Sequence, residues 1–245
     1  NGSYGFALIL QSTNYLFVDG RYTLQANDQS GKFFKIITIP NKMPHDILKR
    51  KKMLIGFDPR LFTKKTLSIF FGKCKCRYKP IKKNLIDEIW KRKMIKNKSK
   101  FFTLSNRSVS ENYQSKINKI IKYLKRKKSD FLFITASENN AWLLNIRGRD
   151  TKYTPIPYSY ILIDKNKKIK FFCDLGKITP SFRKLFKKIE FLDIRTCSKV
   201  LSQIFKKKFI IDKNSCSFLF ESIILKNNKV FNLHDPIYFF KAIKG

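Results

Sequence analysis

Apolar residues recur in this chain at two periods, one typical of helices and one typical of buried strands. The helical spacing i, i+3, i+4, i+7 appears in three segments, which begin at Ile117, Phe182 and Cys197. A single apolar stripe at this spacing predicts a helix that buries one face, so we expect every stripe residue to lie in a core. The stripes are Ile117, Ile120, Ile121 and Leu124; Phe182, Leu185, Phe186 and Ile189; and Cys197, Val200, Leu201, Ile204 and Phe205.

Short apolar runs separate these helical segments. They lie at residues 131–134, 160–163, 169–173, 191–194 and 209–211. Strands that are apolar throughout are typical of a sheet covered on both faces, and their alternation with helices favours a largely parallel or mixed sheet. This half of the chain is therefore predicted to be an α/β domain.

The first eighty residues predict a second, smaller α/β domain. Strands are expected at residues 6–10, 15–18, 33–39, 53–57 and 76–80, and helices at 22–28, 45–51 and 66–71. A basic segment at 79–83 marks the expected boundary, and a helix at 84–90 leads into a lysine-rich loop at 91–100.

Four sequence motifs follow one another in a recognisable order. The longest begins at Thr135-Ala136, continues as AWLLNIRG over residues 141–148 with Asp150, and ends with Pro155 and Ser159-Tyr160. The others read FVDGRY with LQA at 17–26, IGFDP at 55–59 and NLIDEIW at 84–90. In this order they resemble the aminopeptidase P (Xaa-Pro aminopeptidase) family, and the resemblance covers nearly all of the chain.

The resemblance implies two creatinase N-terminal-like (ribonuclease H-like) domains, each a mixed sheet flanked by helices. They would span residues 1–80 and 81–233, and the first would lack its opening strand. Residues 234–245 would begin the helix that leads to a catalytic domain absent from this chain.

The resemblance also implies a function. The chain would be the non-catalytic N-terminal and middle part of a metallopeptidase that removes the residue before a penultimate proline, and it would shape the substrate cleft and form oligomer contacts. The family's two divalent ions, Mn²⁺ or Zn²⁺, would lie in the absent domain, so we expect no cofactor, metal ligand or catalytic residue here and no activity of the chain alone. Proline-containing peptides and a homo-oligomer are the partners expected of the complete enzyme.

Four residues are candidates for the substrate cleft. Arg147, Asp150 and Tyr153 follow the Trp-bearing helix, and charged side chains on a matched loop are not needed for packing. Trp142 is the fourth candidate, with a place in the core as its alternative. An ion pair between Arg147 and Asp150 that stabilises the turn is the alternative for that loop.

Asn140 departs from the family pattern because it stands where the family has an apolar residue. A buried amide left without a partner costs about 1–3 kcal/mol. This departure and the Glu138 found where Asp is usual put a cleft function in question more than the fold.

The net charge of +36 points first to a polyanion, because clustered cations neutralise phosphates. Lys far outnumbers Arg, however, and it occurs with abundant Asn, Ile, Phe and Tyr, as in proteins from AT-rich genomes. Drift of a solvated surface therefore stands beside a second interpretation, in which the chain is a binding module for RNA or an acidic protein. A decaying gene fragment without activity is a third. Non-specific polyanion binding is expected in each case.

The cysteines, the histidines and the lengths of the apolar runs indicate the compartment in which the protein functions. The five cysteines are scattered, and the two histidines are too far apart for a zinc pair, so reduced and mostly buried thiols are expected. No apolar run approaches the roughly 18 residues that cross a bilayer. We expect a basic, cytoplasmic protein without a membrane segment.

Overall fold

The structure is a computed structural model that describes residues 5–90, 97–104 and 108–243. Contacts within the chain divide it into two compact units, residues 1–57 with 65–81 and residues 58–64 with 82–245. The loop predicted at residues 91–100 falls partly outside the described residues, at 91–96. The domain limits at residues 80 and 233 stay predictions.

The first unit contains a three-stranded sheet in the order β1-β2-β3 and a separate parallel pair, β4 and β5. Strand β2 runs antiparallel to β1 and parallel to β3. The strands are β1 Gly5–Ile9, β2 Asn14–Asp19, β3 Lys35–Ile39, β4 Leu54–Phe57 and β5 Arg77–Pro80, and the helices are α1 Thr23–Ser30, α2 Pro44–Leu48 and α3 Lys64–Phe71.

Asp19 caps the turn that follows β2. The Asp19 carboxylate accepts a hydrogen bond from the Arg21 backbone N–H at 3.0 Å and pairs with the Arg21 Nε at 2.8 Å.

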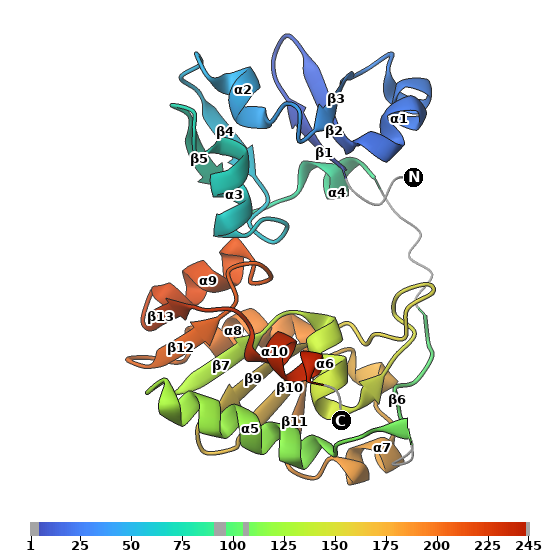
Figure 1. Ribbon diagram of the computed structural model, residues 1–245, viewed down its shortest axis with the longest axis vertical. Helices are drawn as coiled ribbons and strands as arrows, with labels where there is room; N and C mark the ends of the chain where they lie inside the picture. The colour runs from blue at the N-terminus through green and yellow to red at the C-terminus, as the bar shows by residue number, and fades with distance from the viewer. Residues whose placement is uncertain (1–4, 91–96, 105–107, 244–245) are drawn as a thin grey trace. The chain divides into compact units, whose positions relative to one another are not determined.

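The second unit is built on a six-stranded mixed sheet in the order β11-β10-β9-β7-β12-β13 (Figure 1). Strands β7, β12 and β13 are mutually parallel, β9 runs antiparallel to β7 and β10, and β10 is parallel to β11. The strands are β7 Phe131–Ile134, β9 Tyr160–Asp164, β10 Ile169–Cys173, β11 Ile189–Asp193, β12 Lys208–Ile211 and β13 Lys229–Asn232.

Helices cover both faces of this sheet, as the apolar strands predict. They are α5 Tyr113–Arg126, α6 Ser137–Leu144, α7 Pro180–Leu185, α8 Cys197–Ser202, α9 Phe218–Leu225 and α10 Pro236–Ala242. The short helix α4 Leu85–Ile89 has no buried residue and is not part of either core. Two short strands, β6 Phe102–Thr103 and β8 Ile146–Arg147, pair beside α6. The prediction of mixed sheets flanked by helices is confirmed.

Alternation along the strands produces two cores. Leu132 and Ile134 of β7 lie in a core with Ile120 and Leu124 of α5, whereas Phe133 between them lies in the opposite core with α8 and α9. Successive residues of a strand point to opposite faces, so a strand that is apolar at every position supplies both cores.

Two of the three apolar stripes are only partly buried. Leu185 is 60% exposed and Phe205 is 56% exposed, so their predicted places in the core are wrong. The reason is that both helices end early: α7 ends at Leu185 and α8 at Ser202. Ile189 is buried as the first residue of β11 and not as part of a helix.

Candidate functional site

A hollow of about 640 Å³ opens on the second unit beside α6 and α10. Its lining includes Ser110, Glu111, Lys119, Trp142, Phe240 and Lys241. Aromatic rings, one carboxylate and two ammonium groups thus face a single space, and such a lining can hold a short peptide by its side chains and its charges.

Trp142 lies at this hollow and is half-buried against the core on the α5 side of the sheet. The buried Lys116 ammonium stands 4.1 Å from the centre of the indole ring, within the range of a cation–π interaction. Lys116 also donates to the Trp142 carbonyl at 2.8 Å and to Asn145 Oδ1 at 2.6 Å. Burial lowers the pKa of Lys116 to about 8.

The carboxylate of the hollow is held by its neighbours. Lys119 Nζ lies 2.8 Å from Glu111 Oε2, and the Ser115 hydroxyl donates to Glu111 Oε1. Burial favours a higher pKa for Glu111, but the bonds from Lys119 and Ser115 outweigh burial and lower it. Glu111 is therefore an anion at neutral pH.

Arg147 lies in β8, directly after α6. Its guanidinium donates to the Ala141 carbonyl in the last turn of α6 and to the Ile146 carbonyl in β8, both at 3.0 Å. Burial lowers the pKa of Arg147. The side chain supports the Trp142 helix and is not among the residues that line the hollow.

Asp150 pairs with the buried ammonium of Lys177, and its other oxygen accepts from the Tyr158 backbone N–H at 2.7 Å. The alternative of an Arg147–Asp150 pair is therefore wrong. Asp150 does stabilise the loop, but it does so through a lysine that follows β10, a partner that lies 27 residues further along the chain.

Tyr153 is 91% exposed and has a left-handed backbone with φ of 69°. The Lys152 ammonium lies 4.9 Å from the centre of its ring. Of the four candidates, only Trp142 is among the residues lining the hollow, and a role of Arg147, Asp150 and Tyr153 in a cleft stays a prediction.

A buried polar network lies where β12 and β13 end and α10 begins. Asp235 caps α10 by accepting from the Ile237 N–H at 2.9 Å, and its other oxygen accepts from Asn139 Nδ2 at 2.7 Å. Lys241, which lines the hollow, donates to Asn139 Oδ1 at 2.9 Å. Burial raises the pKa of Asp235 to about 6. The network fixes α10 against α6 and so positions the two aromatic sides of the hollow.

Asn140 is fully buried on α6, where an unpaired amide would be costly. Its Nδ2 donates to the Ser159 carbonyl at 2.8 Å and lies 3.3 Å from the Ser159 hydroxyl, but its Oδ1 has no hydrogen-bond partner in the structure. The amide ties α6 to the strand β9, and one of its two polar ends is left unsatisfied.

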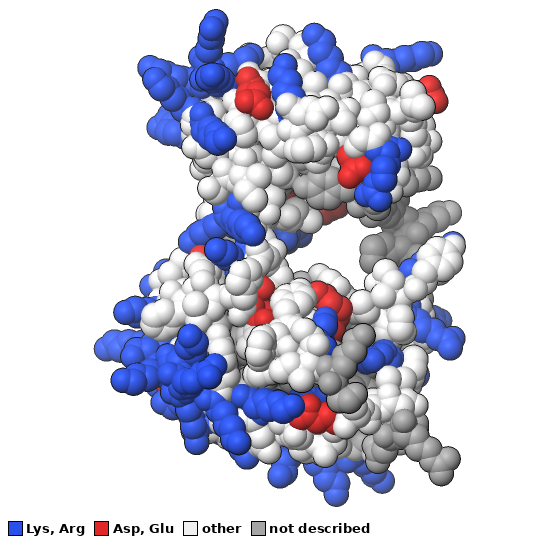
Figure 2. Space-filling view, viewed as in Figure 1, with Lys and Arg blue, Asp and Glu red and all other residues white. Residues whose placement is uncertain are grey.

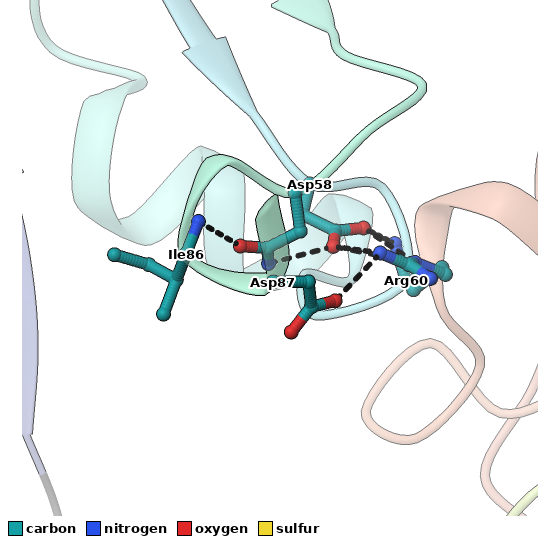
Figure 3. Close-up of polar contacts among 5 residues, drawn as sticks. Asp58, Arg60, Ile86 and Asp87 are labelled. Carbon is teal, nitrogen blue, oxygen red and sulfur yellow. Dashed lines mark hydrogen bonds and ion pairs between the residues drawn. The ribbon is translucent and has the colours of Figure 1, made fainter. Parts of the chain in front are cut away.

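A second polar cluster joins two of the matched motifs (Figure 3). The Arg60 guanidinium lies 2.7 Å from Asp58 Oδ2 and 3.7 Å from Asp87 Oδ2, and Asn84 Nδ2 donates to Asp58 Oδ2 at 2.9 Å. Asn84 Oδ1 in turn caps α4 by accepting from the Ile86 N–H. Burial favours a higher pKa for Asp58, but the bonds from Arg60 and Asn84 outweigh burial and lower it.

This cluster accounts for motif residues to which the sequence assigned no role. The Asp of IGFDP and the Asp of NLIDEIW share the Arg60 guanidinium, and the Asn of NLIDEIW donates to the Asp of IGFDP, so the two motifs are parts of one structural unit. Their matched order along the chain reflects a packed junction, and no cleft role is needed to explain it.

No group of three or more His, Cys, Asp or Glu side chains in the described part of the chain could hold a metal ion. Cys76, Cys173, Cys197 and Cys216 are buried, as expected of scattered thiols. Every helix among the described residues is too short or too polar to traverse a membrane.

Comparison with known proteins gives the family. Residues 91–245 match the family model of the creatinase/prolidase N-terminal domain. The chain belongs to this family. The matched region includes the six-stranded sheet, the Trp142 hollow and α10, so the candidate site lies within the part of the chain that the family model covers.

Its curated relatives are Xaa-Pro aminopeptidases. ApepP of Drosophila melanogaster is 29% identical over 198 residues, which cover 74% of this chain and 31% of that protein. The protein app-1 of Caenorhabditis elegans is 30% identical over 200 residues, 77% of this chain and 32% of that protein. The resemblance to aminopeptidase P is thus confirmed, and the chain spans about a third of the length of these relatives.

A solved structure shows the same fold across the whole chain. It is an X-prolyl aminopeptidase from Caenorhabditis elegans, described as a cytosolic enzyme with a di-nuclear active site, and it superposes with a TM-score of 0.87 at 24% identity. The match covers 100% of this chain and 42% of that one. Both α/β units of this family member therefore have the fold of the corresponding part of that structure.

Sequence reasoning missed the residues that hold the site together. Lys116, Lys177 and Asp235 are buried charges whose partners lie more than twenty residues away, and nothing local in the sequence distinguishes them from the many exposed charges. The only available signal was that Asp235 precedes Pro236, since Asp followed by Pro is typical of a helix start.

Proposed function

We propose that this chain forms the substrate-shaping, non-catalytic part of an Xaa-Pro aminopeptidase-like protein, and that the Trp142 hollow is where it contacts the peptide. The observation that carries the proposal is the combination of Trp142 and Phe240 with Glu111 and Lys241 around one open space of about 640 Å³. The curated relatives, which are Xaa-Pro aminopeptidases, support a peptide as the ligand.

The chemistry of the hollow matches that ligand. A prolyl ring or an apolar side chain can pack on the two aromatic rings, and aromatic side chains contribute large contact areas at low cost in entropy. A peptide's free amino group can approach the Glu111 carboxylate, and its carbonyl or carboxylate groups can approach Lys241. Both protein groups are already positioned, Glu111 by Lys119 and Lys241 by Asn139.

The di-nuclear site named for the nematode enzyme has no counterpart in the described residues, whose acidic and histidine side chains do not fit it. We therefore assign hydrolysis to the complete protein, with two Mn²⁺ or Zn²⁺ ions held by residues outside this chain. In that arrangement this chain binds and orients the peptide, and it contributes no step of the reaction.

We extend the proposal to a cytoplasmic homo-oligomer. The description of the nematode relative as cytosolic supports the compartment. Leu85, Ile86 and Ile89 of α4 are exposed, and exposed apolar residues gathered on one helix favour a contact surface. Light scattering on the complete protein tests the oligomer: a monomeric mass at micromolar concentration contradicts it.

Fluorescence of Trp142 tests peptide binding directly. The chain has two tryptophans, so Trp90→Phe leaves Trp142 as the only reporter. We expect an X-Pro tripeptide to shift its emission with saturation in the millimolar range, and an N-acetylated peptide to bind more weakly because it lacks the charged amine. An emission that does not respond to the peptide contradicts the proposal.

Two neighbouring phenylalanines provide a matched pair of variants. Phe240 lines the hollow, whereas Phe239 of the same helix is exposed and does not line it. Phe240→Ala is expected to weaken peptide binding several-fold and Phe239→Ala to leave it unchanged. Equal effects of the two variants would place the peptide elsewhere.

An activity assay tests the non-catalytic part of the proposal. The pure chain with Mn²⁺ or Zn²⁺ is expected to release no first residue from an X-Pro peptide. Metal-dependent release that survives further purification contradicts it.

A further inference from the structure

We propose that one edge of the six-stranded sheet is a binding surface for RNA, which it holds by the phosphate backbone. This surface is distinct from the Trp142 hollow and does not depend on the proposed peptidase role. We call it the amino edge, because the parallel strands β7, β12 and β13 all begin there.

The strand register places several basic loops in one row. Lys208 is opposite Lys229, Phe209 is opposite Phe131, and Phe131 is opposite Asp164 at the end of β9. The loops that enter the strands at this edge therefore lie side by side. Their exposed basic residues are Lys125, Arg126, Lys127 and Lys128; Lys165, Lys167 and Lys168; Lys187 and Lys188; Lys206, Lys207 and Lys208; and Lys226 and Lys229.

The opposite edge of the same sheet is different. Acidic residues follow the carboxyl ends of its strands, namely Glu138, Asp174, Asp193, Asp212 and Asp235. At the amino edge the acidic residues are Asp130 and Asp164, and Glu190 follows at the second position of β11, where it pairs with Lys170. Figure 2 shows basic side chains gathered at the left of the view, where Figure 1 draws the ends of α5, β7 and β12. The lysines are therefore unevenly placed on this unit, and uniform drift does not account for that.

Backbone angles give an independent reason to conclude that these lysines are retained for their charge and do not arise from codon bias alone. Lys128, Lys167 and Lys206 have left-handed backbones, with φ of 50°, 68° and 54°. Asn and Gly adopt this conformation more readily than Lys. The codons of Asn and Lys both begin with two adenines, so an AT-rich genome supplies Asn as easily as Lys. Asn145 does occupy such a position elsewhere in the chain, yet at the amino edge all three are lysine.

The row is also rigid. Asp130 joins three of its loops: its carboxylate accepts from the Lys208 N–H at 2.9 Å, its carbonyl accepts from the Lys165 N–H at 2.9 Å, and its N–H donates to the Lys208 carbonyl. Lys206 and Lys229 are tied by backbone bonds to Asn227 and Lys207. Of the basic residues in this row, all of which the structure describes, Lys165 is the one with an ion pair, to Asp130. Arg126 and Lys127 lie near the Tyr123 ring and Lys229 lies near the Phe231 ring, and their charges, like those of the remaining lysines, are exposed and can bind an anion.

The shape of the row favours a linear polyanion. Six strands about 4.8 Å apart make an edge of roughly 24 Å, a length over which a nucleic-acid backbone presents several phosphates. Phe205, exposed beside Lys206, offers a ring on which a base can stack. A line of ammonium groups with an adjacent aromatic ring fits RNA better than it fits the plane of a membrane surface. The scarcity of Arg indicates binding without base recognition.

The test compares two variants of equal charge. In one, Lys206, Lys207 and Lys208 become Ser; in the control, Lys49, Lys51 and Lys52 of the first unit become Ser. Binding of a labelled, uridine-rich single-stranded RNA is measured by fluorescence anisotropy over a series of salt concentrations. The edge variant lacks three ammonium groups that would each neutralise a phosphate. Its slope of log K against log salt is therefore expected to become shallower by about 2, whereas the slope of the control stays unchanged. Equal losses of affinity in both variants, or no loss in either, overturn the proposal.

A second variant separates binding from folding. Replacing Lys128, Lys167 and Lys206 together by Asn relieves three left-handed lysines, so Tm is expected to rise by roughly 2–4 °C while RNA affinity falls. A raised Tm with unchanged affinity overturns the proposal. Poly-glutamate or anionic vesicles bound as tightly as RNA, and with the same dependence on the edge lysines, overturn the assignment of RNA as the ligand.

Discussion

The carboxyl of Asp235 makes the stability of the second unit depend on pH in a direction that can be worked out in advance. Burial raises its pKa to about 6, against an ordinary value of 3.8. Between these values the folded protein keeps a proton that the unfolded chain has released. The stabilisation is therefore fully present below about pH 4 and is lost as the pH rises through about 6.

The gap between the two pKa values corresponds to about 3 kcal/mol, and about 2 kcal/mol of it lies between pH 4.5 and 7. Asp212 and Glu138 face Asp235 and raise its pKa further, whereas bonds from the Ile237 N–H and Asn139 oppose burial. Lys241 is held by Asn139 and approaches the same network. Asp235→Asn removes the titrating carboxyl together with the oxygen that accepts from Asn139, and the second loss is the same at every pH.

Urea unfolding of the wild type and Asp235→Asn at pH 4.5 and 7 measures the effect. The variant loses the acceptor for Asn139 at both pH values, which costs about 1 kcal/mol. Relative to the wild type, the variant is expected to gain about 2 kcal/mol on going from pH 4.5 to 7. A difference between the two proteins that does not change with pH refutes the reasoning.

Asp193→Asn is the control of opposite sign. Its carboxylate accepts hydrogen bonds from Arg195, which lower the pKa of Asp193 to about 2. The stability that it contributes is lost only as the pH falls toward 2, so the effect of this variant is expected to be the same at pH 4.5 and 7.

Three further outcomes test the site. In a chain with Trp142 as its only tryptophan, the emission should titrate with a midpoint near pH 8 as Lys116 loses its proton, and Lys116→Met should abolish that titration. Asn140→Asp buries a carboxylate against a carbonyl and is expected to lower the free energy of unfolding in urea by about 3–5 kcal/mol. A decrease below about 1 kcal/mol would show that water reaches and hydrates the carboxylate. A double-mutant cycle of Asp58→Ala and Arg60→Ala should give a coupling energy of about 1–3 kcal/mol, since the two side chains share three hydrogen bonds, and independent effects would contradict the shared cluster.

Much of the fold could be predicted because its signals are local. The central strands are continuous apolar runs, and β7, β9, β10 and β12 lie within a residue of their expected limits. The ends of α7 and α8 could not be predicted in this way. After Leu185 the helical spacing continues through Phe186 to Ile189, yet Ile189 opens a strand. A period alone does not distinguish a helix that continues from a turn that places the next apolar residue in a sheet.

The candidate site was harder to predict from the sequence than the fold, because tertiary contacts position its side chains. The loop after α6 suggested a pair of Arg147 and Asp150, which are close in sequence and opposite in charge. In the structure the two residues have different partners: Arg147 donates to the Ala141 carbonyl of α6, and Asp150 pairs with the buried Lys177. The Arg147 guanidinium is satisfied by backbone carbonyls, whereas the buried Lys177 ammonium would be costly if left unpaired, so Asp150 pairs with Lys177.

The basic surface was also difficult to predict from the sequence. Composition alone cannot distinguish a selected basic surface from codon drift, because both raise the number of lysines. The backbone conformation can distinguish a selected surface from codon drift. Without selection for positive charge, Asn should replace Lys at positions of positive φ, because Asn adopts that conformation more readily. At Lys128, Lys167 and Lys206 the less favourable residue is retained, and all three lie on the edge where the basic loops meet. Three φ angles and the strand register therefore support an RNA surface at this edge. Neither can be read from the sequence alone.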